Sequence, residues 1–205
     1  MSRKIFDHNP DIDKTAYMNW RMNCRSKELN LSQIGNGYFC AAQCLLQNVL
    51  NDNRDKKADI IIFPILFILN QGIEVYLKAI IRLVELFNYG KTNKYATHDI
   101  LQLFNDMMAL IMVDETEPKN LSDFVSPLSS YIEELGSIAA DENGKLKMDF
   151  ARYPFDINGS SFFYITNKNI MVDMEYLLEQ VKQIRELLET LYQMRSVRLE
   201  RKLDT

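Results

Sequence analysis

Three short groups of residues in this sequence have types and spacing that could do chemistry. The first is Glu74 with Lys78, an acid and a base four residues apart. The second is His98, one of only two histidines in the chain. The third is Arg152, which Tyr153 follows in an Asp-Phe-Ala-Arg-Tyr-Pro run. Histidine changes charge near neutral pH and can transfer a proton, and arginine binds phosphate through paired hydrogen bonds.

These groups suggest a site between helices. We hypothesise that the four charged or titratable side chains converge in a cleft, where Arg152 binds phosphate and His98 transfers a proton. Asp99 and Tyr153 would add contacts with the substrate. A structural interpretation fits the same residues, because Glu74 and Lys78 form a favoured helical ion pair and Arg152 could neutralise Glu74. It also makes Asp99 part of a capped first turn and Tyr153 an aromatic at the edge of the core.

No metal or cofactor site is expected. The chain has three cysteines and two histidines, without the spacing of a zinc site. Cys40 and Cys44 share one helix face and are expected to pack as small apolar residues, and the odd total with Cys24 favours reduced thiols. Seven glycines form no phosphate-binding loop, and there is no nucleophile elbow.

Composition limits the class of protein. A chain of 205 residues with 47% hydrophobic residues can close one sizeable core. The net charge of -4 creates no global field that attracts nucleic acid, so any such contact must be local. The start carries no apolar stretch of signal-peptide length, and the most apolar run, 60–69, is too short to span a bilayer. We expect a cytoplasmic protein that does not bind membranes.

The elements that would position these residues follow from the spacing of apolar side chains. Steps of three and four residues predict helices over 32–50, 59–88, 97–112, 126–140 and from 173 onward. Asp59 is available to cap the second helix, Thr97 is the expected N-cap of the third, and Ser126 with Pro127 signals the start of the fourth. The second helix carries a polar stripe at four-residue steps, made of Asn70, Glu74, Lys78 and Arg82.

The pattern changes between the fourth and the last helix. Apolar and polar residues alternate after 145, and Asn158 with Gly159 marks a turn, which predicts a short extended, hairpin-like segment near 146–166. Residues 1–28 are polar and irregular, and we interpret them as an N-terminal arm in front of a single helical domain, 29–205. The predicted fold class is therefore all-α, an up-and-down helical bundle.

The Glu-x-x-x-Lys helix, the His-Asp helix start and the Arg-Tyr-Pro run, in this order, resemble the prokaryotic branch of the HEPN-type proteins (higher eukaryote and prokaryote nucleotide-binding domains). The resemblance covers roughly 32–191 and continues in the Val172-Asp173 start of the last helix. It implies a bundle with two long antiparallel helices, frequent homodimerisation and a role in toxin-antitoxin, phage-defence or RNA-processing systems. Many members are metal-independent ribonucleases, with an Arg followed four to six residues later by a His.

This chain has no histidine in its last core helix, where that hallmark would be expected. Arg3 and His8 have the bare spacing but lie in the polar terminus. We therefore expect a non-catalytic HEPN-like protein that binds RNA or a nucleotide in a prokaryotic defence or toxin-antitoxin-like system, as a homodimer and with a possible cognate partner protein. One alternative is a metal-independent ribonuclease with a non-standard site at His98 and Arg152. The other is a dimerisation module that pairs through helices 59–88 and 173–201.

Overall fold

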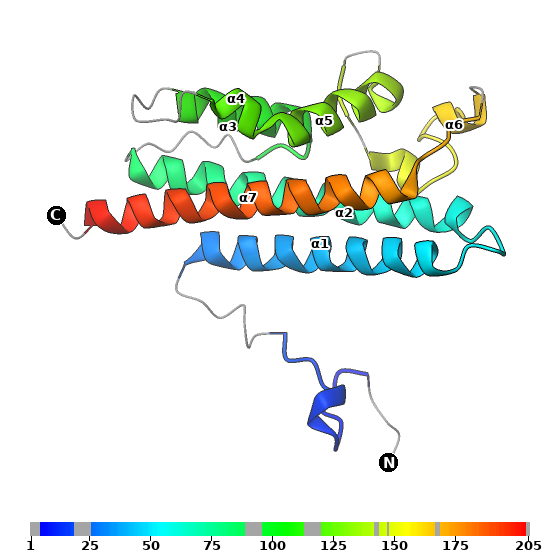
Figure 1. The fold of residues 1–205 in the computed structure, drawn as a ribbon, viewed down its shortest axis with the longest axis horizontal. Helices are drawn as coiled ribbons and strands as arrows, with labels where there is room; N and C mark the ends of the chain where they lie inside the picture. Colours follow the sequence, from blue (N-terminus) through cyan, green and yellow to red (C-terminus); the bar gives the residue numbers. More distant parts are fainter. Residues whose placement is uncertain are drawn as a thin grey trace.

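The helical spacing of the apolar residues produces an all-α helical bundle in this computed structural model (Figure 1). The structure describes residues 5–18, 26–88, 96–112, 120–141, 144–146, 148–166 and 169–203. In chain order the elements are η1 (Ile12–Lys14), α1 (Lys27–Asn51), α2 (Ala58–Phe87), α3 (Ile100–Met112), α4 (Leu121–Phe124), α5 (Ser126–Ala139), η2 (Met148–Ala151), α6 (Phe163–Thr166) and α7 (Met174–Leu203). The predicted fold class is thus confirmed.

The helix α2 lies at the centre of the bundle, in contact with α1, α3 and α7. Figure 1 shows that α1 runs antiparallel to both α2 and α7. Half of the thirty residues of α2 are buried. By length and hydropathy α2 is also long and apolar enough to cross a membrane. The buried core helix of a soluble protein meets the same two criteria. Three neighbouring helices pack against α2 here.

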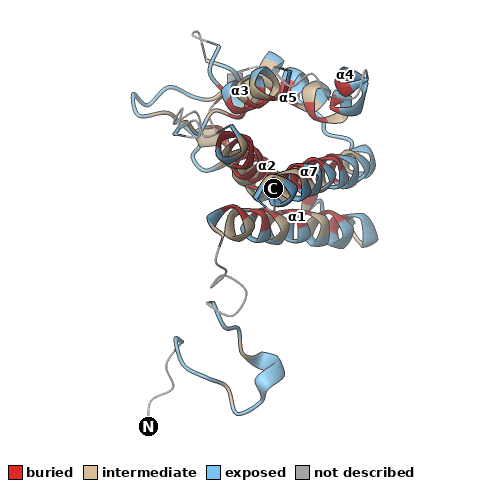
Figure 2. Cartoon of the chain, turned by 90° about the vertical axis from the view of Figure 1, so that its left-hand side faces the viewer, coloured by how far each residue is buried: buried red, intermediate tan, exposed pale blue. Residues whose placement is uncertain are grey.

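Three layers build the molecule, and their buried faces are turned toward one another (Figure 2). The first layer is α1, the second contains α2 with α7, and the third contains α3, α4 and α5. Where the first two layers meet, the ring of Tyr76 lies between Phe39 of α1, with centroids 6.0 Å apart, and Tyr192 of α7, at 6.5 Å. Burial raises the pKa of the Tyr76 phenol to about 12.

The first two helices follow their predicted ranges with two differences. Helix α1 begins at Lys27, inside the predicted arm, because the Ser26 hydroxyl caps it by accepting a hydrogen bond from the Leu29 amide at 3.2 Å. Asp59 is wrong as a cap, since it lies inside the first turn of α2, whose N-cap position is Lys57. Residues 52–57 form the turn and irregular chain that connect the two helices.

The start of α3 also differs from its prediction. The helix begins at Ile100, and the Asp99 carboxylate caps it by accepting hydrogen bonds from the amides of Leu101 (3.0 Å) and Gln102 (3.4 Å). Thr97 is therefore wrong as the N-cap. Its hydroxyl instead accepts a hydrogen bond from the Asp99 amide at 3.1 Å, which fixes the turn before the helix.

The segment between α5 and α7 contains less extended chain than the alternation of residues predicts. It forms two isolated antiparallel bridges, Ala140 with Leu146 and Phe155 with Ser161. Between and after them lie the short helices η2 and α6. Gly159 has a φ of +80°, the left-handed conformation that a tight turn requires. In the described part of this segment, the paired chain is thus limited to these two bridges, and only the second lies wholly within the predicted range 146–166.

Candidate functional site

A buried carboxylate joins three of the predicted site residues. The Oε1 atom of Glu74 lies 2.7 Å from Nζ of Lys78 and 2.9 Å from Nδ1 of His98. Only 7% of the Glu74 side chain is exposed, but 83% of the His98 side chain is. Helix α2 supplies the acid and the lysine, and the turn before α3 supplies the histidine. Three of the four side chains that were expected to converge therefore lie within hydrogen-bonding distance of one another through Glu74.

The geometry of this cluster fixes the tautomer of the imidazole. A carboxylate only accepts hydrogen bonds, so the Nδ1 atom of His98 must carry the proton that it shares with Glu74. Nε2 then faces outward and has no hydrogen-bond partner among the described residues. The cluster contains one carboxylate, one ammonium and one titratable imidazole. Its net charge is therefore zero when His98 is neutral and +1 when it is protonated.

All four residues of the polar stripe of α2 form side-chain hydrogen bonds. Each four-residue step turns about 40° around the helix, so successive members face different neighbours. Asn70 donates to the Tyr131 hydroxyl of α5 at 2.8 Å, and Arg82 donates to Glu28 of α1 at 2.8 Å. Glu74, between them, faces the start of α3. Residues of the stripe thus bond α2 to α5, to α1 and to the turn before α3. Of these partners, His98, which bonds Glu74, is largely exposed to solvent.

Arg152 does not join this cluster, and the expected four-residue convergence is wrong. It forms an ion pair with Asp149, and its guanidinium lies 5.6 Å from the ring centre of Phe67 and 5.2 Å from that of Tyr153. Phe67 precedes Glu74 by seven residues, which is two helical turns. Arg152 therefore contacts the helix at a position about 10 Å along α2 from Glu74.

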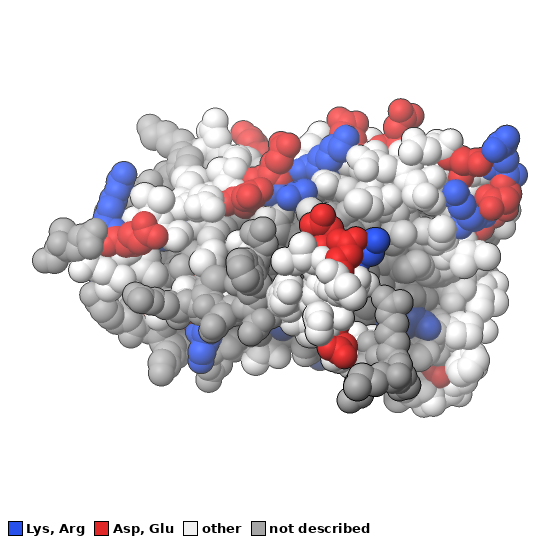
Figure 3. All heavy atoms as spheres, turned by 90° about the horizontal axis from the view of Figure 1, so that it is seen from below, with Lys and Arg blue, Asp and Glu red and all other residues white. Residues whose placement is uncertain are grey.

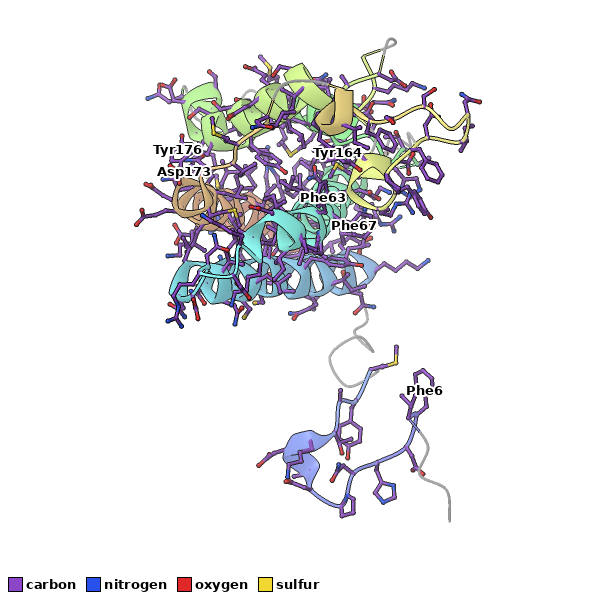
Figure 4. All side chains as sticks on the ribbon, turned by 90° about the vertical axis from the view of Figure 1, so that its right-hand side faces the viewer. Phe6, Phe63, Phe67, Tyr164, Asp173 and Tyr176 are labelled. Carbon is purple, nitrogen blue, oxygen red and sulfur yellow. The ribbon has the colours of Figure 1, made fainter. Side chains whose placement is uncertain are left out.

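Aromatic side chains surround the position of Arg152. Figure 4 shows Phe63, Phe67 and Tyr164 close together, and the rings of Phe63 and Tyr164 have centres 5.0 Å apart. Half of Tyr153 is exposed, and its carbonyl accepts a hydrogen bond from the Tyr164 hydroxyl at 3.2 Å. A guanidinium among aromatic rings can hold a stacked base. Sequence reasoning missed Phe67, although its spacing from Glu74 places both on one helix face.

Asp99 has a local role in the structure. Its carboxylate accepts two backbone hydrogen bonds at the start of α3, and this capping positions the turn that carries His98. The predicted contact between Asp99 and a substrate stays a prediction. Arg3 and Cys24 lie outside the described residues, and His8 is exposed beside Asp7 in the arm.

A separate pocket of about 300 Å³ lies between α5 and the start of α7. Its walls are mainly apolar, with Tyr131, Ile138 and Met171 among them, and the charged residues that line it, Glu134 and Asp173, are both acidic. In Figure 4, Asp173 and Tyr176, which line this pocket, lie apart from the aromatic cluster. No residue of the Glu74 cluster lines it. An acidic rim disfavours phosphate, so we do not assign this pocket to the candidate site.

The described residues contain no group of three or more His, Cys, Asp and Glu that could hold a metal ion. Cys40 and Cys44 are exposed, so the expectation that they pack as buried apolar residues is wrong. Comparison with known proteins finds no matching family model, curated protein or solved structure. The functional interpretation therefore rests on the residues and geometry of this chain, and the resemblance to HEPN-type proteins stays a prediction.

Proposed function

We propose that this chain is a HEPN-like protein that binds RNA or a nucleotide through its phosphates, without cleaving it. The observation that carries the proposal is the exposed His98 imidazole, held by its Nδ1 atom on the buried carboxylate of Glu74. This bond orients Nε2 toward solvent in a fixed direction. A protonated imidazole so placed can donate a charge-assisted hydrogen bond to a phosphate oxygen.

Lys78 supports the same ligand class. Its ammonium bonds the oxygen of Glu74 that also holds His98, so the acid is already neutralised when a phosphate approaches. Protonation of His98 then leaves one net positive charge at the mouth of the cluster. Since the whole chain has a net charge of -4, a local positive charge is what an anionic ligand requires.

The position of Arg152 favours an RNA chain over a single nucleotide. Arg152 lies against Phe67 and His98 against Glu74, and these two positions of α2 are about 10 Å apart along the helix, a separation that one phosphate group cannot bridge. An oligonucleotide can contact both and can stack a base near Tyr153, whose ring is half exposed. A mononucleotide would contact His98 or Arg152, but not both.

The test is the affinity for a fluorescently labelled single-stranded RNA, measured by anisotropy at pH 6 and low salt. We expect His98→Ala and Arg152→Ala each to weaken RNA binding roughly three- to tenfold, the effect of one exposed charged contact of about 1 kcal/mol. Binding of AMP should respond to His98→Ala but not to Arg152→Ala if it occupies the Glu74 cluster. RNA affinity should fall with added salt, because the contacts are with phosphates.

Two matched variants control for general changes in charge. His8→Ala removes the other histidine, which lies in the arm, and Arg54→Ala removes an exposed arginine from the loop before α2. Neither should change the RNA affinity by more than about twofold. The proposal is refuted if the site variants bind RNA as the wild type does, or if the controls weaken binding equally.

One observation favours a second candidate function, a metal-independent ribonuclease. A histidine whose Nδ1 atom is bonded to a carboxylate and whose Nε2 atom is open has the arrangement of a general base. Arg152 would then stabilise the charge of the phosphate, but only after moving toward His98. Incubation with mixed RNA in the presence of a chelator tests this function: cleavage that is lost in both His98→Ala and Arg152→Ala selects the ribonuclease over the binding protein.

The biological setting that we propose is the one implied by the resemblance. It is a prokaryotic defence or toxin-antitoxin-like system in the cytoplasm, in which a cognate partner protein is encoded beside this chain. Co-expression with the product of a neighbouring gene, followed by purification through a tag on this chain, tests for that partner. A stoichiometric complex supports the setting, and growth inhibition by this chain that the neighbour relieves supports the toxin-antitoxin form.

A further inference from the structure

The outer face of α1 carries no charged residue. From Leu29 to the end of the helix at Asn51 the sequence contains no Asp, Glu, Lys or Arg. The exposed residues recur at helical spacing and are small, apolar or amide side chains: Gln33, Ile34, Gly37, Cys40, Ala41, Cys44, Gln47, Asn48, Leu50 and Asn51. A helix face in water normally carries charges, so this face has the composition of a surface that is covered.

We propose that this outer face of α1 binds the same face of a second copy of the chain, in an antiparallel pair. The inference is independent of the proposed function. It also replaces the expectation that helices 59–88 and 173–201 form the interface. In the structure α2 packs against α1, α3 and α7, and α7 packs against both α1 and α2.

The chemistry of the face favours a second copy over a different protein. A face without charges offers no pattern that would select or orient a charged partner, whereas two neutral copies meet without like-charge repulsion. Side-chain amides both donate and accept hydrogen bonds, so Gln33, Gln47 and Asn48 can pair with their own kind across a two-fold axis. Gly37 has no atom within 4 Å of where a Cβ would be, which lets a second helix approach closely.

The arm adds to this surface. Figure 1 shows residues 5–18 on the side of the bundle where α1 has its free face. In Figure 3, which views this side, charged side chains gather mainly along the upper edge and the right end, with a few scattered elsewhere. Ile5, Phe6, Ile12 and Met18 are 92%, 91%, 68% and 80% exposed. These are large apolar side chains with no cover in a single copy.

The area required for a stable dimer predicts that the arm takes part. A helix of 25 residues is about 37 Å long and about 10 Å wide, so the flat strip that α1 presents to a partner measures about 370 Å² per copy. A standard interface buries about 800 Å² per partner. The arm adjoins α1 and offers the apolar side chains that would make up the difference.

The exposed cysteines provide a direct test in the full chain. Cys40 and Cys44 lie in the middle of the face, so in an antiparallel pair they come within about one helical turn of the corresponding thiols of the second copy. In a Cys24→Ser background, a short bis-maleimide should link two chains through these residues at micromolar concentration. Cys40→Ser/Cys44→Ser should abolish the linked dimer.

Charge insertion tests the same face by a second measurement. Light scattering and sedimentation should show a dimer, and Ala41→Arg, which places two like charges opposite each other, should raise its Kd by about two orders of magnitude. Ala109→Arg is the matched control, because Ala109 is exposed on α3 in the opposite layer, and it should leave the Kd unchanged. Ile5→Ser/Phe6→Ser should raise the Kd by about tenfold or more.

Ionic strength separates this interface from a charged one. A neutral interface should keep its Kd, or tighten, when NaCl rises from 0.05 to 1 M, because there are no charges to screen. Circular dichroism and the melting temperature check that each variant folds. The proposal is overturned by a monomer at 100 μM, by a dimer that Ala109→Arg disrupts and Ala41→Arg does not, or by a dimer that dissociates in high salt.

Discussion

Replacing Lys78 tests whether Glu74 is as desolvated as the structure shows. The side chains of Glu74 and Lys78 are only 7% and 14% exposed, and their ion pair measures 2.7 Å. Removing one partner of a buried pair costs about 3 to 5 kcal/mol, because the other charge remains buried without compensation. His98 still donates to Glu74 after the change, so we expect Lys78→Met to cost about 3 kcal/mol, the lower end of that range.

The reverse change should cost less. Glu74→Met leaves the ammonium of Lys78, which can reach water along its flexible stem, and we expect a loss of about 1 to 2 kcal/mol. In the double variant, apolar side chains of similar volume replace the pair at little cost, but His98 loses its acceptor, so we expect a loss of about 1 to 2 kcal/mol. The coupling energy between the two positions is then about 3 kcal/mol, far above the value for an exposed pair.

Urea denaturation followed by circular dichroism measures these values. With a slope of about 1 to 3 kcal/mol per molar urea, a loss of 3 kcal/mol lowers the unfolding midpoint by about 1 to 3 M. The slopes should not change between variants, which would show that the same surface is exposed on unfolding. A loss below about 1 kcal/mol for Lys78→Met, additive with that of Glu74→Met, would mean that water screens the pair. The carboxylate could then not hold His98 in a fixed direction.

Two further predictions concern the packing and acid stability of the bundle. At Gly35 an added Cβ would lie 2.5 Å from a ring carbon of Tyr76, so Gly35→Ala should destabilise the protein by about 1 kcal/mol net. Gly136 has open space around it, so Gly136→Ala should stabilise the protein by up to about 1 kcal/mol. Thermal denaturation measures both changes. Burial raises the pKa of Glu28, but hydrogen bonds, including one from Arg82, outweigh burial and lower it overall. The ion pair of Glu28 with Arg82 therefore stabilises the fold above the unfolded pKa of about 4.3, and this stabilisation is lost as the pH falls through the lower folded pKa. Arg82→Met should lower the free energy of unfolding by about 2 kcal/mol at pH 7 and by much less at pH 3. Urea titrations at the two pH values measure the difference.

The long helices could be predicted because their apolar residues repeat with the period of the helix they form. Helix α4 could not, since four residues are too few to show a period. The sequence suggested Thr97 as the cap of α3. The structure instead uses Asp99, two residues later and the stronger capping residue type, because the backbone turns into the helix after it. The start of α1 was hidden because polar residues fill its first turn.

The candidate site was predictable where it depends on local spacing. Glu74 and Lys78 lie on one helix face by their spacing, and a helix packed beside α2 brings His98 to them. The position of Arg152 depends on the height along α2 at which η2 packs, and no local pattern in the sequence encodes that height. The neutral face of α1 was visible in the sequence as a long run without charges. Its importance follows only once the structure shows which side of α1 is exposed.

The most direct test of the central claim is the NMR signal of the His98 imidazole during an RNA titration. His8→Gln leaves His98 as the only histidine of the chain, so its ring resonances need no further assignment. If RNA binds at the Glu74 cluster, the Nε2 and Cε1 resonances of His98 should shift with added RNA and saturate at the Kd measured by anisotropy. The account is contradicted if RNA binds and these resonances do not move, or if they move equally when Glu74→Gln has removed the carboxylate that orients the ring.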